Sequence, residues 1–287
     1  MTTARRPIPD TLRTYARGVA GGLLFSLPLL YTMELWSAGH AASPWRLLAL
    51  LFGAIGLLLA YNWAGGLRAA QGWSENIFEA AEEMCLGILT AAVVLFLLGQ
   101  VAPAASPGEW IGRVTIEGAI AAIGVSVGTE QLGDSEGAAG AGGRSGRLPA
   151  VVGELAPAAL GAMLIAANVA PTDEVAIVAS QAGQLHLVGL MIVSTLTAGL
   201  LLNASDFRGA DRLARRDAGL GPLRGTAVTY SVAFVVAALL LWVIGQFDGE
   251  APSVMLARTV VLAFPAALGA AAGRLLLGGD AGNHRAD

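Results

Sequence analysis

Long apolar runs restrict the fold of this chain more than any other feature of its sequence. A helix needs about 20 consecutive apolar residues to cross a bilayer, and several runs reach that length. Hydrophobic residues fill 55% of the 287 positions and charged residues only 13%, whereas a soluble domain carries about 25% charged residues. The runs are also too long and uniform for the strands of a membrane barrel. We therefore predict an all-α, polytopic helix bundle in a lipid bilayer.

Eight runs are predicted to be transmembrane helices, at approximately 14–34, 46–63, 82–101, 112–129, 149–169, 184–203, 223–246 and 255–277. All 17 basic residues are arginines, and 14 of them lie at the two termini or in the second, fourth and sixth loops. Only Arg46, Arg113 and Arg258 lie on the opposite side. Because arginine is enriched in cytoplasmic segments, both termini are predicted to face the cytoplasm.

Two similar stretches indicate an internal repeat. "AAVVLFLLGQ" (91–100) matches "AALLLWVIGQ" (237–246), and a shift of 145 residues then aligns Arg113 with Arg258. The predicted units are 1–128 and 148–287, joined by a glycine-rich cytoplasmic linker at 129–147. Four helices in each unit would give parallel repeats, since both units then enter the membrane from the same side.

The acidic residues gather near the two ends of the predicted bundle. A shift of 140 residues aligns Thr32-Met33-Glu34 with Thr172-Asp173-Glu174, at matching outer positions in the two repeats. Ionisable groups in membrane segments usually face a cavity or a partner, so we predict an outer ion-binding site and an inner acidic station. The outer site comprises Thr32, Glu34, Glu117, Asn168, Thr172, Asp173 and Glu174, and the inner station comprises Glu82, Glu83 and Glu130.

A purely structural alternative exists for each of these acids. Acidic residues are favoured in the first turn of a helix, which suits the inner glutamates at the start of the third span. Thr172 is a candidate N-cap of a short re-entrant or interfacial helix over 174–184. Glu34, by contrast, precedes no obvious helix start, and Asn168 could be a ligand or an ordinary interhelical hydrogen-bonding residue.

Arg113 and Arg258 are the predicted ion-pair partners of the outer acids. Arg113 lies four residues before Glu117, so these two could pair along one helical face. Alternatively, the arginines pair with Glu34 and Glu174 across the bundle, or extend to the outer membrane interface.

The spacing Gly124-x-x-x-Gly128 recurs as Gly269-x-x-x-Gly273, and it permits close helix contact. We predict that the fourth span packs against the eighth at these glycines.

No motif favours an enzyme or a cofactor. "GVSVG" (124–128) has the spacing of a hydrolase nucleophile, but such a serine must follow a strand, and Ser126 lies in a predicted membrane helix. The glycine-rich linker follows no strand either, as a dinucleotide-binding loop would. The three histidines have no metal-binding spacing, and nothing indicates nucleic-acid binding.

The motifs "YTMELW" (31–36), "EGAIAAIG" (117–124) and "NVAPTDE" (168–174) resemble those of a bacterial family of uncharacterised integral membrane proteins. The resemblance covers approximately residues 10 to 280. It implies a multi-pass protein of the bacterial inner membrane, and it implies no activity or site residues.

Two functions agree with these patterns. The first is a small cation transporter or channel for protons, Na⁺, Ca²⁺ or Mg²⁺, since carboxylate oxygens bind hard cations and buried carboxyls carry protons. The second is a non-transporting sensor or an accessory subunit, in which the acids only cap helices. Transport predicts that Glu34, Glu117 and Glu174 converge on a hydrated cavity between the halves.

Overall fold

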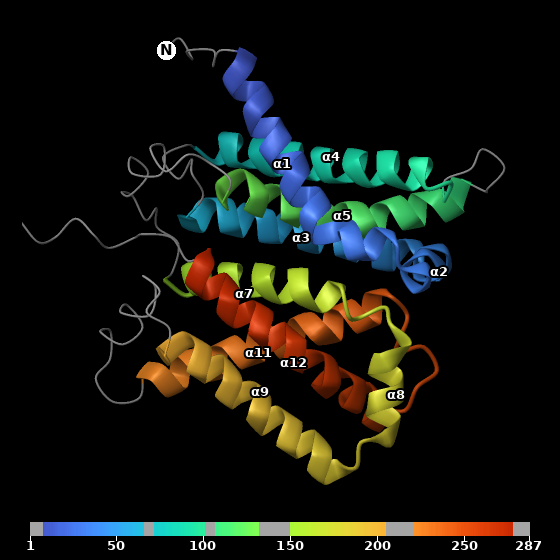
Figure 1. Cartoon of the computed structure of the whole chain (residues 1–287), viewed down its shortest axis with the longest axis vertical. Coiled ribbons are helices and arrows are strands. Elements are labelled where there is room, and N and C mark those ends of the chain that lie inside the picture. Colours follow the sequence, from blue (N-terminus) through green and yellow to red (C-terminus); the bar gives the residue numbers. More distant parts are fainter. Residues whose placement is uncertain (1–7, 66–71, 101–106, 132–149, 205–220, 278–287) are drawn as a thin grey trace, which may run out of the picture.

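The computed structural model describes residues 8–65, 72–100, 107–131, 150–204 and 221–277, which form ten helices and, within those ranges, no strand. The helices of the first half are α1 (Ile8–Leu30), α2 (Met33–Ala41), α3 (Pro44–Gly65), α4 (Trp73–Leu97) and α5 (Pro107–Gln131). Those of the second half are α7 (Ala150–Ala167), α8 (Asp173–Gln181), α9 (Gln184–Ala204), α11 (Gly221–Val243) and α12 (Pro252–Leu276). The predicted all-α class is confirmed (Figure 1).

Six helices are long and apolar enough to cross a membrane, namely α3, α4, α5, α9, α11 and α12. Helices α1 and α2 qualify only as a pair bent by 88°, and the apolar part described in α7 is shorter, Leu155–Ala167. By length and composition, the described residues therefore contain six candidate spans, or seven if the bent pair is one span, and the count of eight stays a prediction. Helices α4 and α5 both begin before the predicted starts at 82 and 112, because polar first turns hide their N-termini.

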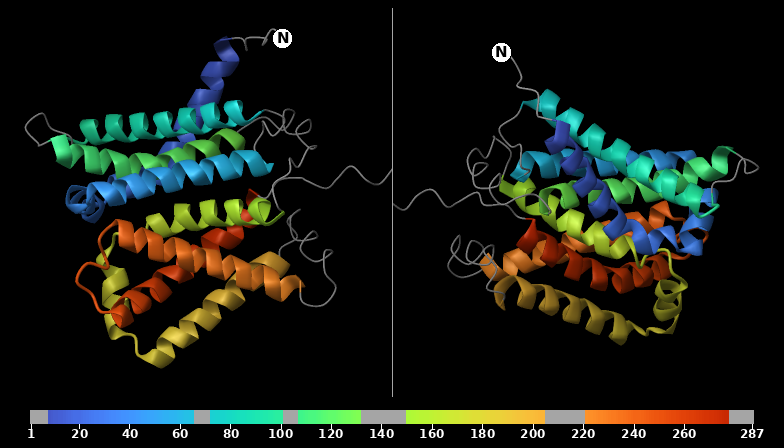
Figure 2. Two further views of the ribbon diagram at one scale, coloured as in Figure 1. Left: turned by 180° about the vertical axis from the view of Figure 1, so that it is seen from behind. Right: turned by 45° about the horizontal axis from the view of Figure 1, so that its top comes forward.

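In each half, the first long helix is followed by a helix of nine residues, α2 or α8. Pro28 lies in the last turn of α1, where its missing N–H weakens the helix. Thr32 and Thr172 are the extended N-cap residues of α2 and α8. Both short helices lie at the same end of the bundle (Figures 1 and 2), called the α2/α8 end below.

The matched stretches at 91–100 and 237–246 end their helices with the same cap. The Gln100 N–H donates to the Leu95 carbonyl at 2.8 Å, and the Gln246 N–H donates to the Leu241 carbonyl at 2.9 Å. In each cap the preceding glycine has a positive φ, 73° at Gly99 and 83° at Gly245. This is the Schellman arrangement, which favours glycine at the left-handed position.

The two glycine pairs do not join α5 to α12, so that prediction was wrong. A Cβ on Gly21 of α1 would lie 2.5 Å from the Gly124 carbonyl oxygen, against the first pair. A Cβ on Gly161 of α7 would lie 2.8 Å from the Gly273 Cα, against the second pair. Each pair thus packs against the first helix of its own half, because the small residue that completes the close contact is located there.

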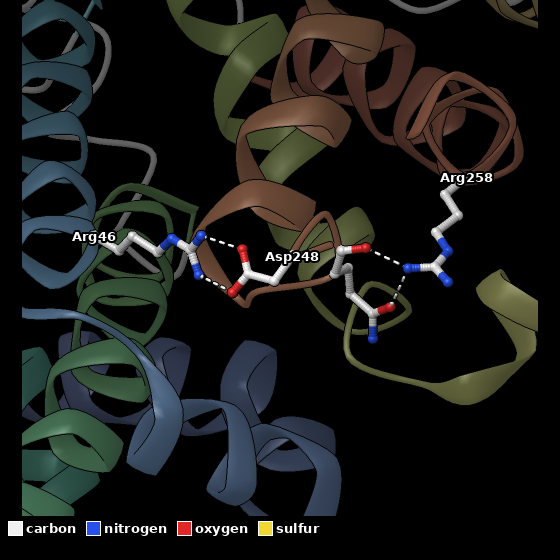
Figure 3. Close-up of polar contacts among 4 residues, drawn as sticks. Arg46, Asp248 and Arg258 are labelled. Atoms are coloured by element: carbon white, nitrogen blue, oxygen red, sulfur yellow. Dashed lines mark hydrogen bonds and ion pairs between the residues drawn. The ribbon is translucent and has the colours of Figure 1, made fainter. Parts of the chain in front are cut away.

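The predicted linker at 129–147 lies mostly outside the described residues, and α5 continues through its first positions to Gln131. The two halves meet chiefly where α3 packs against α7 and α11, and α5 against α7 (Figure 2). The apolar core continues across this boundary. At the α2/α8 end, Arg46 of α3 binds Asp248 of the α11–α12 loop (Figure 3).

A candidate site at a buried carboxyl

Glu117 is the most deeply buried acid among the described residues, with 0% of its surface exposed. It lies ten residues after Pro107, about 15 Å along α5 at ~1.5 Å per residue. The helix has 25 residues, so it is about 37 Å long, and Glu117 lies near its middle. The predicted location near the outer end of this span was therefore wrong, because α5 begins five residues earlier than its apolar pattern indicates.

Both carboxyl oxygens of Glu117 are buried and have no hydrogen-bond partner. Two polar groups act on this carboxyl, the Trp36 indole of α2 and the Arg113 guanidinium. The Trp36 Nε1–H lies near this carboxyl, but it is itself buried without a hydrogen-bond partner. An unmade hydrogen bond between buried groups costs about 1–3 kcal/mol, so this pair lowers the stability of the fold.

Arg113 binds backbone carbonyls instead of an acid. Its Nε donates to the Trp36 carbonyl at 3.3 Å, and its Nη1 donates to the Gln100 carbonyl at 2.8 Å. Arg113 thereby joins α5 to α2 and to the cap after α4. The expected hydrogen-bonded pair with Glu117 is not formed, although the positive charge lies near the carboxyl.

Arg258 of α12 aligns with Arg113 at a shift of 145 residues. Its Nη1 donates to the Gln246 carbonyl, and its Nη2 donates to Glu250 at 2.7 Å. Figure 3 shows its side chain directed toward the loop that also contains Asp248. The alternative pairing of the two arginines with Glu34 and Glu174 is not formed, because Arg113 binds backbone carbonyls and Arg258 binds a carbonyl and Glu250.

The outer acids occupy the first turns of the two short helices. Glu34 lies in the first turn of α2, and Asp173 and Glu174 lie in that of α8; all three are exposed. The expectation that Glu34 precedes no helix start was wrong, because the bend after α1 interrupts what reads as one apolar run. Hydrogen bonds from its own backbone and from Thr172 lower the pKa of Glu174 below its ordinary value.

The polar residues beside these acids make local hydrogen bonds. The hydroxyls of Thr32 and Thr172 donate backward, to the Pro28 carbonyl at 2.7 Å and the Val169 carbonyl at 2.9 Å. Asn168 donates to the Leu164 carbonyl at 2.6 Å and to the Phe25 carbonyl of the other half at 3.4 Å. These contacts join helices, and they assemble no shared site with Glu117.

A second group of buried polar side chains lies between α3, α4 and α5. The Asn62 Nδ2 donates to Glu83 at 3.0 Å, and the Ser126 hydroxyl approaches Asn62 Oδ1 at 3.4 Å. Glu83 also makes a further polar interaction. The predicted inner station included Glu83, but it missed Asn62 and Ser126. The sequence indicates these two residues only by placing a polar side chain within an apolar run.

The other two predicted inner acids differ from Glu83 in their surroundings. Glu82 is half-buried. One carboxyl oxygen of Glu130, near the end of α5, is buried without a hydrogen-bond partner. Among the described residues, no group of three His, Cys, Asp or Glu side chains could hold a metal ion.

The cavity between the halves is small and apolar. Its volume is about 10 Å³, and its lining includes Leu35, Leu50, Ile120, Ala167, Leu240 and Ile244. A single water needs about 10–15 Å³ and polar partners, so this apolar space is at the lower limit for one water. None of the predicted ion-binding residues lines it. Glu34 and Glu174 are exposed and Glu117 is fully buried, so the expected convergence of these three acids on this cavity is not found among the described residues.

Comparisons with known proteins identify a family and no further relative. Residues 14–277 match the model of an integral membrane protein family designated DUF2391. No curated protein and no solved structure matches the chain. The match covers most of the sequence and confirms the resemblance inferred from the motifs.

Proposed function

We propose that this chain, which belongs to the DUF2391 family of integral membrane proteins, carries protons across the membrane with Glu117 as the group that binds them. The observation that carries this proposal is the burial of an unpartnered carboxyl near the middle of a membrane helix. Ionisable residues at such depth are costly, and they commonly belong to ion pathways or proton relays.

The predicted duplication strengthens this argument, and we include it in the proposal. It is supported by matching caps after α4 and α11, matching glycine contacts in α1–α5 and α7–α12, and matching arginines. The shift of 145 residues that aligns Arg113 with Arg258 also aligns Glu117 with Leu262. Leu262 is likewise 0% exposed. Packing at this position is thus satisfied by an apolar side chain, so a carboxyl there calls for another explanation.

The surroundings of Glu117 favour a proton over a metal cation. Ca²⁺ takes six to eight oxygen ligands, and Mg²⁺ needs a near-octahedral set. The polar groups acting on Glu117 are instead a guanidinium and an indole N–H, which are both donors. Donors stabilise a carboxylate and repel a metal ion, whereas a proton needs only the carboxyl itself.

A carrier agrees with this interior better than a channel does. The cavity between the halves is small and apolar, and the side chain of Glu117 is fully enclosed. Access from either side therefore requires helices to move. The Arg46–Asp248 pair at the α2/α8 end joins the halves in the conformation described.

A second function has one observation in its favour. Glu34, Asp173 and Glu174 are exposed residues in the first turns of helices, as a non-transporting sensor or accessory subunit predicts. The buried carboxyl distinguishes the two functions, because a purely structural module gains no stability from it.

Proton flux in proteoliposomes tests the proposal. Vesicles containing the protein and a trapped pH-sensitive dye would be given a pH gradient, with valinomycin and K⁺ to remove the opposing potential. Glu117→Gln should abolish the protein-dependent flux, because the amide cannot release a proton. Glu34→Gln, at an exposed first-turn acid, is the matched control and should retain it. No flux in the parent, or equal flux in the parent and Glu117→Gln, would overturn the proposal.

A further inference from the structure

Helix α2 approaches α5 closely, just before Glu117. A Cβ on Gly39 of α2 would lie 2.8 Å from the Arg113 Cα, and a Cβ on Gly112 of α5 would lie 2.8 Å from the Gly39 carbonyl carbon. Both helices therefore need glycine where they cross. The Arg113 Nε also donates to the Trp36 carbonyl at 3.3 Å, which fixes α2 at this crossing.

The Trp36 side chain packs against the neighbouring helices of the first half. Its ring packs against a small apolar cluster formed by Leu30, Leu95 and Val114. Its Nε1–H is buried without a partner and acts on Glu117, whose two oxygens also have none. A buried donor and a buried acceptor thus lie near each other without a hydrogen bond between them. This arrangement suits a carboxyl that alternates between a neutral form and an ionised one.

At the matching positions, the second half has neither the indole nor the two glycines. The shift of 140 residues aligns Trp36 with Ala176 and Gly39 with Ala179, and the shift of 145 aligns Gly112 with Ala257. There, the Arg258 Nε is buried without a partner, whereas the Arg113 Nε binds α2. The differences therefore accompany the exchange of Glu117 for Leu262. The two glycines of the helix crossing and the Trp36 indole thus occur in the same half as the Glu117 carboxyl.

We infer that Trp36 is a positioning residue for Glu117: its indole N–H bonds the carboxylate when the proton leaves, and α2 covers the carboxyl from the α2/α8 end. The inference deepens the proposed proton transport and rests on it. It assigns the closing of one entrance to the nine-residue helix α2, held by the contact between Gly39 and Gly112. Proton entry from that side then requires α2 to lift.

Few other groups could control the charge of Glu117. Residues 18–30 of α1 and 86–97 of α4 contain no ionisable side chain. On α5, Arg113 is the charged group that acts on Glu117, while Glu109 and Glu130 lie eight and 13 residues away along the helix. On α2, both Glu34 and His40 are exposed. Arg46 of α3 is engaged by Asp248. Removing the indole N–H should therefore change the proton equilibrium of this carboxyl directly.

Infrared difference spectroscopy of the purified full-length protein in nanodiscs tests this inference without a transport assay. The carbonyl stretch of protonated Glu117 is the band that disappears in Glu117→Gln, and its intensity is followed against pH. Trp36→Phe keeps an aromatic ring and removes the donor. Loss of a hydrogen bond to the charged carboxylate should raise the midpoint of the Glu117 titration in Trp36→Phe by about one to two pH units. Trp45→Phe, at an exposed tryptophan of α3, should leave the midpoint unchanged.

A second pair of variants tests the role of α2 as a cover. Gly39→Ala should raise the midpoint in the same direction, because the added Cβ pushes α2 and its indole away from α5. Ala179→Gly, at the matching position of α8, should leave it unchanged.

An unchanged midpoint in Trp36→Phe, with the band still titrating, would overturn the inference. The absence of any band in the parent that depends on Glu117 would overturn it as well. A raised midpoint in protein that moves no protons would support the pairing of Trp36 with Glu117 and refute the proposed transport, so the two failures are distinguishable.

Discussion

Arg46 of α3 and Asp248 of the α11–α12 loop form an ion pair through two hydrogen bonds, one of them 2.7 Å long between Nη1 and Oδ2. The Arg46 guanidinium also lies 5.7 Å from the centre of the Trp242 ring, within the range of a cation–π interaction. Residues 202 positions apart in sequence thus join the two halves at the α2/α8 end.

This pair predicts a pH dependence of stability. The hydrogen bonds from Arg46 lower the pKa of Asp248 below its ordinary value. The contribution of this ion pair to the free energy of unfolding is therefore complete above the unfolded-state pKa of Asp248, near 3.9. It is lost as pH falls through the lower folded-state pKa. Asp248→Asn should reduce the melting temperature slightly at neutral pH, and the difference from the parent should vanish in acid. A difference that persists in strong acid, or one that Asp173→Asn reproduces, would contradict this assignment.

The glycine contacts predict a clear difference between two alanine substitutions. Gly161→Ala should lower the free energy of unfolding by about 1–3 kcal/mol, as overpacking does, because its Cβ would collide with the α12 backbone. Gly56→Ala in α3 is the control, since nothing lies within 4 Å of its Cβ. The control should be neutral or stabilising by up to about 1 kcal/mol. Thermal unfolding in detergent measures both, and equal effects would contradict the packing of α7 on α12.

The two helix caps predict equal costs at distant positions. Gly99→Ala and Gly245→Ala each place a Cβ at a positive φ, at a cost of about 1–2 kcal/mol. The matching hydrogen bonds of the two caps make the losses similar. Denaturation of both variants beside Gly53→Ala, a helical glycine with open space around it, provides the comparison. Similar stability in all three proteins would argue against the caps.

Glu117 predicts an increase in stability on mutation. Glu117→Leu replaces an unpartnered buried carboxyl with the residue found at the matching position 262. The free energy of unfolding should rise by about 1–3 kcal/mol, the usual cost of an unsatisfied buried polar group. Thermal unfolding at neutral pH measures the change, with Glu34→Leu as a control at an exposed acid. A large loss of stability in Glu117→Leu would indicate that the carboxyl serves the fold.

Hydrophobic run length predicted the helical class because membrane insertion depends on local composition. It failed wherever a boundary depended on polar turns, as at the start of α4, or on a bend, as between Leu30 and Met33. That bend hid the helix start before Glu34, and an acid in a first turn was therefore interpreted as a ligand. The glycine partners on α1 and α7 were missed because spacing identifies a contact face without identifying the neighbour.

Glu117 itself was recognised in the sequence as an acid within a membrane run, but its depth and its neighbour were not. The depth depended on where α5 begins. The neighbour, Trp36, lies 81 positions earlier in the sequence on a helix that its own apolar run concealed. Asn62, Glu83 and Ser126 likewise meet only through the packing of three helices.

Proton flux through three forms of residue 117, measured in the same vesicles, tests the central claim most directly. The parent should carry protons down an imposed pH gradient, Glu117→Gln should not, and Glu117→Asp should retain part of the flux because it keeps a carboxyl. Flux in Glu117→Gln equal to that of the parent would contradict the claim that this carboxyl carries the proton.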